Sequence, residues 1–156
     1  PSGKLIEMAK SRGVKAFIGR GEEQIFDAES FGTVFLIFTL CFLDSPLDVL
    51  KEVKRILIPG GKLVLGLVLK DSPWGMWYQQ KKEEGHRFYK YARFYNCSEV
   101  VKLMFKAGLM GDQMVSTLMQ KPGDVKLVEE PKGGYYPEGG FTILVGVKRE
   151  NTGPVF

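Results

Sequence analysis

The sequence predicts an α/β protein with a parallel sheet, and three features of residues 31–69 carry this prediction. Val34–Leu43 is an almost unbroken apolar run, and Leu63–Leu69 is a second one. Between them lies a segment with helical periodicity, Ser45–Leu57. Because both runs are apolar on either face, they suit strands of a parallel sheet that is covered on both sides. The order strand, helix, strand indicates a β-α-β unit.

The middle segment of this unit has the pattern of an amphipathic helix. Its apolar residues recur at helical spacing, and its charged residues fall on the opposite face. We expect Ser45 to cap the first turn and Pro46 to occupy the first helical position. Pro59 and Gly60 stop the helix and suit a type II turn before the second strand.

The segments on either side continue the alternation of helices and strands. Pro1–Gly13 is predicted to be a helix capped by Ser2, and Val14–Ile18 is predicted to be a short strand. Asn96–Ala107 is predicted to be a helix, because Asn96 and Glu99 can form a capping box. Further strands are expected at Gln113–Met119 and Phe141–Val147, with an irregular loop rich in glycine and proline over residues 121–140.

The composition changes after Lys70, where aromatic residues become frequent. Residues 71–95 are predicted to form a mostly helical, aromatic-rich insertion, and this span also holds the chain's one histidine, His86. One interpretation is that the aromatic rings are the core of a small helical insertion. The other is that they form a lid over a small-molecule site.

Length and charge bound the class of protein. At 156 residues with a net charge of +4, the chain is expected to be one domain, residues 1–150, followed by a tail, residues 151–156. No block of basic residues favours a nucleic-acid partner, and no apolar run is long enough to span a membrane. Cys41 and Cys97 belong to no paired motif, so no metal site is predicted. We expect a cytoplasmic protein.

No motif of covalent or metal-assisted catalysis occurs in the chain. A ligand would instead lie outside the carboxyl ends of the parallel strands, as in other open α/β sheets. These ends are Gly19–Glu22, Thr39–Leu43 and Lys70–Trp74. The alternative is that these segments are ordinary connecting loops.

Five stretches in the same order resemble the class I S-adenosylmethionine-dependent methyltransferases, in particular the type 11 group. Pro1-Ser2 followed by a helix is similar to the stretch just after the family's second strand. Arg20–Phe26 (RGEEQIF) is similar to the family's A-E-x-L-P-F segment, and Asp27–Phe31 (DAESF) to its D-x-S-F-D segment. Pro46–Leu65 matches P-x-x-x-L-x-E-x-x-R-x-L-x-P-G-G-x-L, and Asn96–Leu109 matches the late helix that ends in A-G-F. The resemblance runs from residue 1 to about residue 149.

The resemblance implies a Rossmann-like sheet of order 3-2-1-4-5-7-6, mostly parallel with an antiparallel last strand and with helices on both faces. It implies S-adenosylmethionine as cofactor, bordered by Gly21, Glu22, Thr39, Leu40 and Cys41. It places the acceptor near Trp74, Trp77, Tyr78 and Arg93. If a general base is needed, the resemblance favours His86 or Tyr89.

The chain departs from the family pattern in two places. Position 32 is Gly where the family usually has Asp. The glycine-rich first motif, and with it strands 1 and 2, would lie before residue 1. Strands 14–18 and 34–40 would then have open edges, which favour pairing with another chain. We expect the chain to be a fragment, to form a homodimer along strand 34–40, or to pair strand 14–18 directly with strand 34–40.

The leading functional hypothesis is therefore methyl transfer from S-adenosylmethionine to a small-molecule acceptor. The alternative is a non-catalytic domain of the same ancestry that acts as a partner-binding or dimerisation module. An NAD-dependent oxidoreductase lacks any fingerprint in the sequence.

Overall fold

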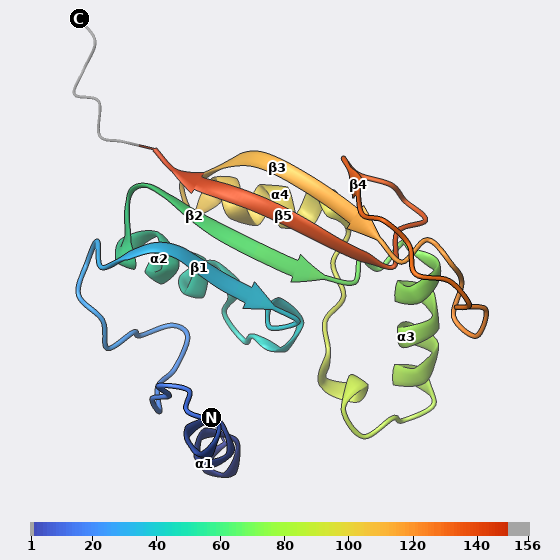
Figure 1. Ribbon diagram of the computed structural model, residues 1–156, viewed down its shortest axis with the longest axis horizontal. Helices are drawn as coiled ribbons and strands as arrows, with labels where there is room; N and C mark the ends of the chain where they lie inside the picture. Colours follow the sequence, from blue (N-terminus) through green and yellow to red (C-terminus); the bar gives the residue numbers. More distant parts are fainter. Residues whose placement is uncertain (1, 150–156) are drawn as a thin grey trace, which may run out of the picture.

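The computed structural model describes residues 2–149 and shows a mixed sheet of order β1-β2-β5-β3-β4 (Figure 1). The strands are β1 Phe31–Ile37, β2 Leu57–Leu67, β3 Leu109–Thr117, β4 Lys132–Gly133 and β5 Phe141–Lys148. β1 and β2 are parallel, and β5 lies antiparallel between β2 and β3, so β1, β2 and β3 run in one direction. This is the 4-5-7-6 part of the expected order, and the predicted fold class is confirmed.

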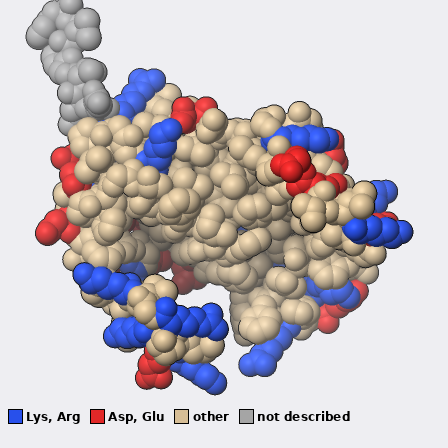
Figure 2. All heavy atoms as spheres, in the orientation of Figure 1, with Lys and Arg blue, Asp and Glu red and all other residues tan. Residues whose placement is uncertain are grey.

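Helices and short 3₁₀ turns alternate with these strands, much as the periodicity predicts. They are α1 Gly3–Ser11, η1 Leu40–Phe42, α2 Pro46–Ile56, α3 Pro73–Glu83, η2 Tyr89–Tyr91 and α4 Cys97–Lys106. The Ser2 hydroxyl accepts a hydrogen bond from the Leu5 amide, and Asn96 and Glu99 form the predicted capping box. Ser45 is the N-cap of α2, but its side chain makes no capping hydrogen bond. The predicted tail, residues 151–156, lies outside the described residues (Figure 2).

The predicted β-α-β unit is present, with shifted strand boundaries. β1 ends at Ile37 rather than residue 40, and β2 begins at Leu57, directly after α2. The Pro-Gly turn lies inside β2, where the register jumps from Phe31↔Leu57 to Thr33↔Lys62. Gly60 has φ +74°, as the second central position of a type II turn requires.

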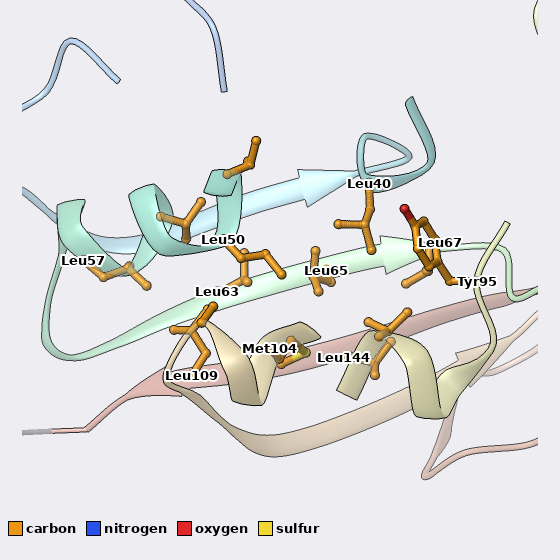
Figure 3. Close-up of a cluster of buried hydrophobic side chains, with 14 of the residues drawn as sticks. Leu40, Leu50, Leu57, Leu63, Leu65, Leu67, Tyr95, Met104, Leu109 and Leu144 are labelled. Atoms are coloured by element: carbon orange, nitrogen blue, oxygen red, sulfur yellow. The ribbon is translucent and has the colours of Figure 1, made fainter. Parts of the chain in front are cut away.

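The core lies between one face of the sheet and the helices α2 and α4 (Figure 3). Leu63 and Leu65 of β2 and Leu50 of α2 are fully buried there. Within residues 2–149 no helix covers the opposite face. The prediction placed helices on both faces, and the described residues have them on one face. Phe35 of β1 and Ile37 of the same strand are 64% and 40% exposed on this opposite face.

The prediction of a strand at Val14–Ile18 is wrong, because these residues form no regular structure. Phe17 and Ile18 are 47% and 65% exposed. An extended segment needs a neighbouring strand to satisfy its backbone groups, and no described strand lies beside it. The alternative in which this segment pairs directly with β1 is therefore also wrong. β1 is an edge of the described sheet, free along one side.

The aromatic-rich segment leaves the sheet after β2 and returns to the same place. The Lys70 amide donates a hydrogen bond to the Tyr95 carbonyl (2.9 Å), and the Lys70 ammonium pairs with Glu99 at 3.3 Å. α3 is capped by Ser72, whose hydroxyl accepts from the Gly75 amide. α3 and η2 contact each other at the carboxyl end of β2 (Figure 1).

Candidate functional site

A cavity of about 300 Å³ lies where β1 and β2 end, beneath the aromatic-rich segment. We call it the aromatic pocket. The strand ends supply one wall through Phe38, Cys41 and Leu67. The remaining lining residues are Phe42, Val68, Tyr78, Tyr89, Ala92, Arg93, Phe94 and Tyr95. A pocket of this size and apolar character, with a few polar groups, is typical of small-molecule sites.

Three aromatic rings from the 71–95 segment cover this pocket. Tyr78 of α3 lies 4.7 Å from Tyr89 and is stacked with Phe94, measured between ring centroids. Burial raises the pKa of Tyr78, and the neighbouring Tyr89, to which it is hydrogen-bonded, raises it further. Tyr78 therefore carries its proton at neutral pH and can donate a hydrogen bond.

The walls of the aromatic pocket combine an unusual backbone conformation with polar groups that are partly or fully buried. Phe38 has φ +52°, a left-handed conformation that bulky residues rarely adopt. Burial raises the pKa of the Cys41 thiol, which keeps it protonated. The Tyr95 hydroxyl is buried and has no hydrogen-bond partner within residues 2–149. The Arg93 amide donates to the Cys41 carbonyl (2.7 Å) and ties the two walls together.

A second cavity, of about 410 Å³, runs along the free side of β1. We call it the edge groove. Gly21, Phe26, Thr39 and Val49 contribute to its walls. Phe38 lines the aromatic pocket and Thr39 lines the edge groove. Two successive residues at the end of β1 therefore line different cavities.

An ion pair on α2 holds the 19–26 segment at the edge groove. Arg55 pairs with Glu52 at 3.0 Å and donates to the carbonyl of Phe26 at 2.9 Å. Glu52 accepts a hydrogen bond from the Gln24 amide at 3.2 Å. The hydrogen bond from Arg55, more than any other cause, lowers the pKa of the Glu52 carboxyl. The segment is thus positioned by a charged contact with a helix rather than by sheet pairing.

The structure divides the five residues predicted to border the cofactor. Gly21 and Thr39 line the edge groove, whereas Cys41 lines the aromatic pocket. The Leu40 side chain is 1% exposed and belongs to the core, so only its backbone can face a ligand. Glu22 lies next to Gly21, lines neither cavity, and pairs with Arg20 at 3.7 Å.

The residues predicted to lie near the acceptor are divided in a similar way. Tyr78, Tyr89 and Arg93 line the aromatic pocket. Trp74 does not: its indole donates to the Gln120 carbonyl (2.7 Å) and covers Gly140. Trp77 packs against Tyr78 from outside the pocket.

His86 is exposed and stacks on Tyr89 at 4.5 Å, also outside the pocket. It can therefore reach the pocket only through Tyr89.

Phe38, Phe42 and Phe94 line the pocket and were not among the predicted site residues. Phe38 lies in the apolar run that was predicted to be a strand, and Phe42 lies in the segment that was predicted to follow the end of this strand. Phe94 could have been found from the density of aromatic residues in the 71–95 segment. The left-handed backbone of Phe38 has no sequence signal, because it follows from where β1 stops.

Comparisons with known proteins give the family. A family model described as a methyltransferase domain matches residues 1–65. An uncharacterized protein of Methanocaldococcus jannaschii is 32% identical over 147 residues, which cover 94% of this chain and 70% of that protein. The structure also superposes on an S-adenosylmethionine-dependent methyltransferase, a possible histamine N-methyltransferase, of Thermotoga maritima. The TM-score is 0.90 at 39% identity, over 96% of this chain and 71% of that one. The chain belongs to the S-adenosylmethionine-dependent methyltransferases.

This methyltransferase spans only part of its relatives. An uncharacterized protein of Mycobacterium tuberculosis is 32% identical over 148 residues, and the match covers 52% of that protein. None of the helices between residues 2 and 149 has the length and apolar character needed to cross a membrane. In the same range, no three His, Cys, Asp or Glu side chains lie close enough together to bind a metal ion.

S-adenosylmethionine is the cofactor of this family, and the edge groove fits its adenosine part. The apolar walls from Phe26, Leu43 and Val49 suit a purine ring. The free side of β1 offers backbone amide and carbonyl groups that no strand uses. A Cβ on Gly21 would come within 3.0 Å of Val49, so a larger residue would crowd this wall. The described residues provide no glycine-rich turn for the methionine part.

Proposed function

We propose that this methyltransferase methylates a small molecule that binds in the aromatic pocket. The observation that carries the proposal is that two successive residues at the end of β1 line different cavities, Phe38 the aromatic pocket and Thr39 the edge groove. A methyl donor in the edge groove and an acceptor in the aromatic pocket would then meet at the end of β1. We further propose that the 71–95 segment acts as the lid of this site.

The protein's part in such a reaction is to position the acceptor and exclude water. When bound, S-adenosylmethionine supplies an electrophilic methyl group. Tyr78, protonated and half-buried, would orient the acceptor through its hydroxyl, and Phe94 would fix the plane of the acceptor by stacking. For an acceptor that loses a proton, the candidates are Tyr89, which lines the pocket, and His86, whose ring stacks on Tyr89 from outside. We propose that the Tyr89 hydroxyl takes this proton while giving up its own, and that His86 or solvent receives the proton released.

The test of the donor site is a calorimetric titration of S-adenosylhomocysteine into the 156-residue chain. We expect micromolar affinity. Glu22 pairs with Arg20 and neighbours Gly21 of the edge groove, and we propose that its carboxylate turns to a cofactor hydroxyl on binding. Glu22→Gln should then bind about tenfold more weakly, since one charged hydrogen bond contributes about 1.5 kcal/mol. Glu23→Gln is the matched control, because Glu23 is exposed and adjacent. Equal affinities for the two variants would remove Glu22 from the site.

The test of the acceptor site is methyl transfer from radiolabelled S-adenosylmethionine to a panel of small molecules. Tyr78→Phe should raise the acceptor KM about tenfold and leave S-adenosylhomocysteine affinity unchanged, because Tyr78 lines the aromatic pocket and not the edge groove. Tyr135→Phe is the control, since Tyr135 lines neither cavity. A loss of cofactor affinity in Tyr78→Phe would contradict the assignment of the pocket to the acceptor.

A small amine is a second candidate acceptor. The Thermotoga maritima protein, 39% identical, is a possible histamine N-methyltransferase. The aromatic walls of the pocket could hold an amine through cation–π contacts. A panel that contains histamine tests this candidate directly.

Two further parts of the sequence prediction stay proposals. We propose that, when no cofactor fills the edge groove, a second copy of the chain pairs along the free side of β1, so that cofactor binding and this pairing exclude each other. Cytoplasmic location stays a prediction from the sequence. The non-catalytic module receives less support, because the chain matches a methyltransferase structure over 96% of its length.

A further inference from the structure

A third cavity, of about 440 Å³, lies on the outer side of the 71–95 segment. Its lining residues are Phe42, Arg87, Phe88, Lys90 and Tyr91, and we call it the outer cleft. Phe42 also lines the aromatic pocket, so the two cavities adjoin at this ring. A ligand in the aromatic pocket could therefore extend past Phe42 into the outer cleft.

Three basic residues border this path at intervals of three along the chain: Arg87, Lys90 and Arg93. Each lies over the face of an aromatic ring, at 5.5 Å from Phe88, 4.7 Å from Tyr91 and 5.0 Å from Tyr95 respectively. Within residues 2–149 none of the three forms an ion pair, whereas nearby Lys70 and Lys81 both do. Their charges are held in place by the rings and remain available to a ligand.

Neither cavity has an acidic lining residue. The aromatic rings of the outer cleft are open to solvent, with Phe42 at 50%, Phe88 at 62% and Tyr91 at 74% exposure. Exposed apolar surface grouped in this way is typical of a binding site.

We propose that the outer cleft binds an anionic group of the acceptor, a carboxylate or a phosphate, while the acceptor's ring lies in the aromatic pocket. This inference rests on the proposed function and specifies that the acceptor carries a negative charge. A cationic amine would meet Arg87, Lys90 and Arg93, and like charges oppose binding. Glu99 lies near Arg93, but it lines neither the aromatic pocket nor the outer cleft. The preferred acceptors are then aromatic acids rather than aromatic amines.

The experiment is a calorimetric comparison of three phenols that differ only in the terminal group: 4-hydroxyphenylacetate, 4-ethylphenol and tyramine. We expect the acid to bind about tenfold more tightly than the neutral phenol, and tyramine to bind more weakly than both. Raising the salt concentration should reduce the preference for the acid. Phenyl phosphate in place of the acid shows whether carboxylate or phosphate is preferred.

The double variant R87Q/K90Q should lose most of the preference for the acid. The matched control is K10Q/R12Q, which removes the same two charges from α1, where neither residue lines a cavity. Equal affinity of the unmodified chain for the acid and the neutral phenol would overturn the inference, and so would an undiminished preference in R87Q/K90Q. These measurements need no methyl transfer, so a chain that prefers the acid and methylates none of the phenols would count against the proposed function alone.

Discussion

Phe38 follows β1 directly and has a left-handed backbone conformation. It lines the aromatic pocket, and the next residue, Thr39, lines the edge groove. The Phe38 amide donates to the Gly66 carbonyl (2.8 Å), and its ring packs 5.0 Å from Phe141. These contacts hold a backbone geometry that costs a non-glycine residue about 1 kcal/mol. The strain turns the chain away from the sheet and directs Phe38 and Thr39 to different cavities.

We expect Phe38→Gly to be more stable than Phe38→Ala by about 1 kcal/mol. Both variants lack the ring, and only glycine adopts φ +52° without steric cost. The free energy of unfolding in urea measures the difference. The same pair of substitutions at Ile37, which lies in β1, is the control and should favour alanine. A more stable alanine variant at position 38 would show that this conformation is not strained.

The sequence predicts where the site lies better than it predicts which side chains face the cavities. That ligands gather where β1 ends follows from the apolar run and the β-α-β pattern. Which of Leu40 and Cys41 faces a cavity depends on the short turn η1, which buries the first and turns the second toward the aromatic pocket. No periodicity in the sequence describes such a turn.

At the scale of elements, the N-terminus of α4 shows how a local motif acts on stability. The backbone amide of Asn96 donates to the Glu99 carboxylate at 2.8 Å, and the Glu99 amide donates to Asn96 Oδ1 at the same distance. The hydrogen bond from Asn96 is the largest cause that lowers the pKa of Glu99, and Lys70 lowers it further. The folded protein therefore favours the charged carboxylate.

This shift gives Glu99 a stabilising effect that depends on pH. Because its pKa is lower in the folded state, the effect is present above the unfolded value of about 4.5 and is lost as pH falls below it. We expect Glu99→Gln to lower the free energy of unfolding at pH 7 and to lower it less at pH 3. Urea unfolding at both pH values measures this change in the free energy of unfolding, and Glu83→Gln is the control. An equal loss at pH 3 would contradict this account.

Elements with their own local signals were predicted well, and those that depend on neighbours were not. The caps at Ser2 and Asn96 and the period of α2 are encoded within a few residues, and the structure confirms them. The strand predicted at Val14–Ile18 depends on a partner that the described sheet lacks. The start of β3 at Leu109 rather than Gln113 depends on its pairing with β5.

At the scale of the whole molecule, the sheet has one side without a partner. β1 presents its backbone groups along that side, and Phe35 is 64% exposed on the uncovered face beside it. Exposed edges of this kind favour pairing with another chain. This is the physical basis for the proposed homodimer.

We expect the 156-residue chain to self-associate in sedimentation velocity, and Phe35→Lys to shift it toward monomer, because a lysine on an edge strand opposes pairing. Phe105→Lys is the matched control: Phe105 is 68% exposed but lies on α4. A chain that stays monomeric at every concentration would rule out pairing through β1.

The hydrogen bond between Lys70 and Tyr95 has a consequence for how this molecule can change over evolution. Residues 71–94 depart from the sheet and rejoin it at this hydrogen bond, and Trp74 and Arg93 tie the segment to Gln120 and Cys41 close to its two ends. Their sequence can be exchanged, lengthened or shortened without altering the register of β2 or the cap of α4. Chains that share this sheet can therefore differ in this one segment while keeping the same sheet, which is the route we expect for a change of acceptor.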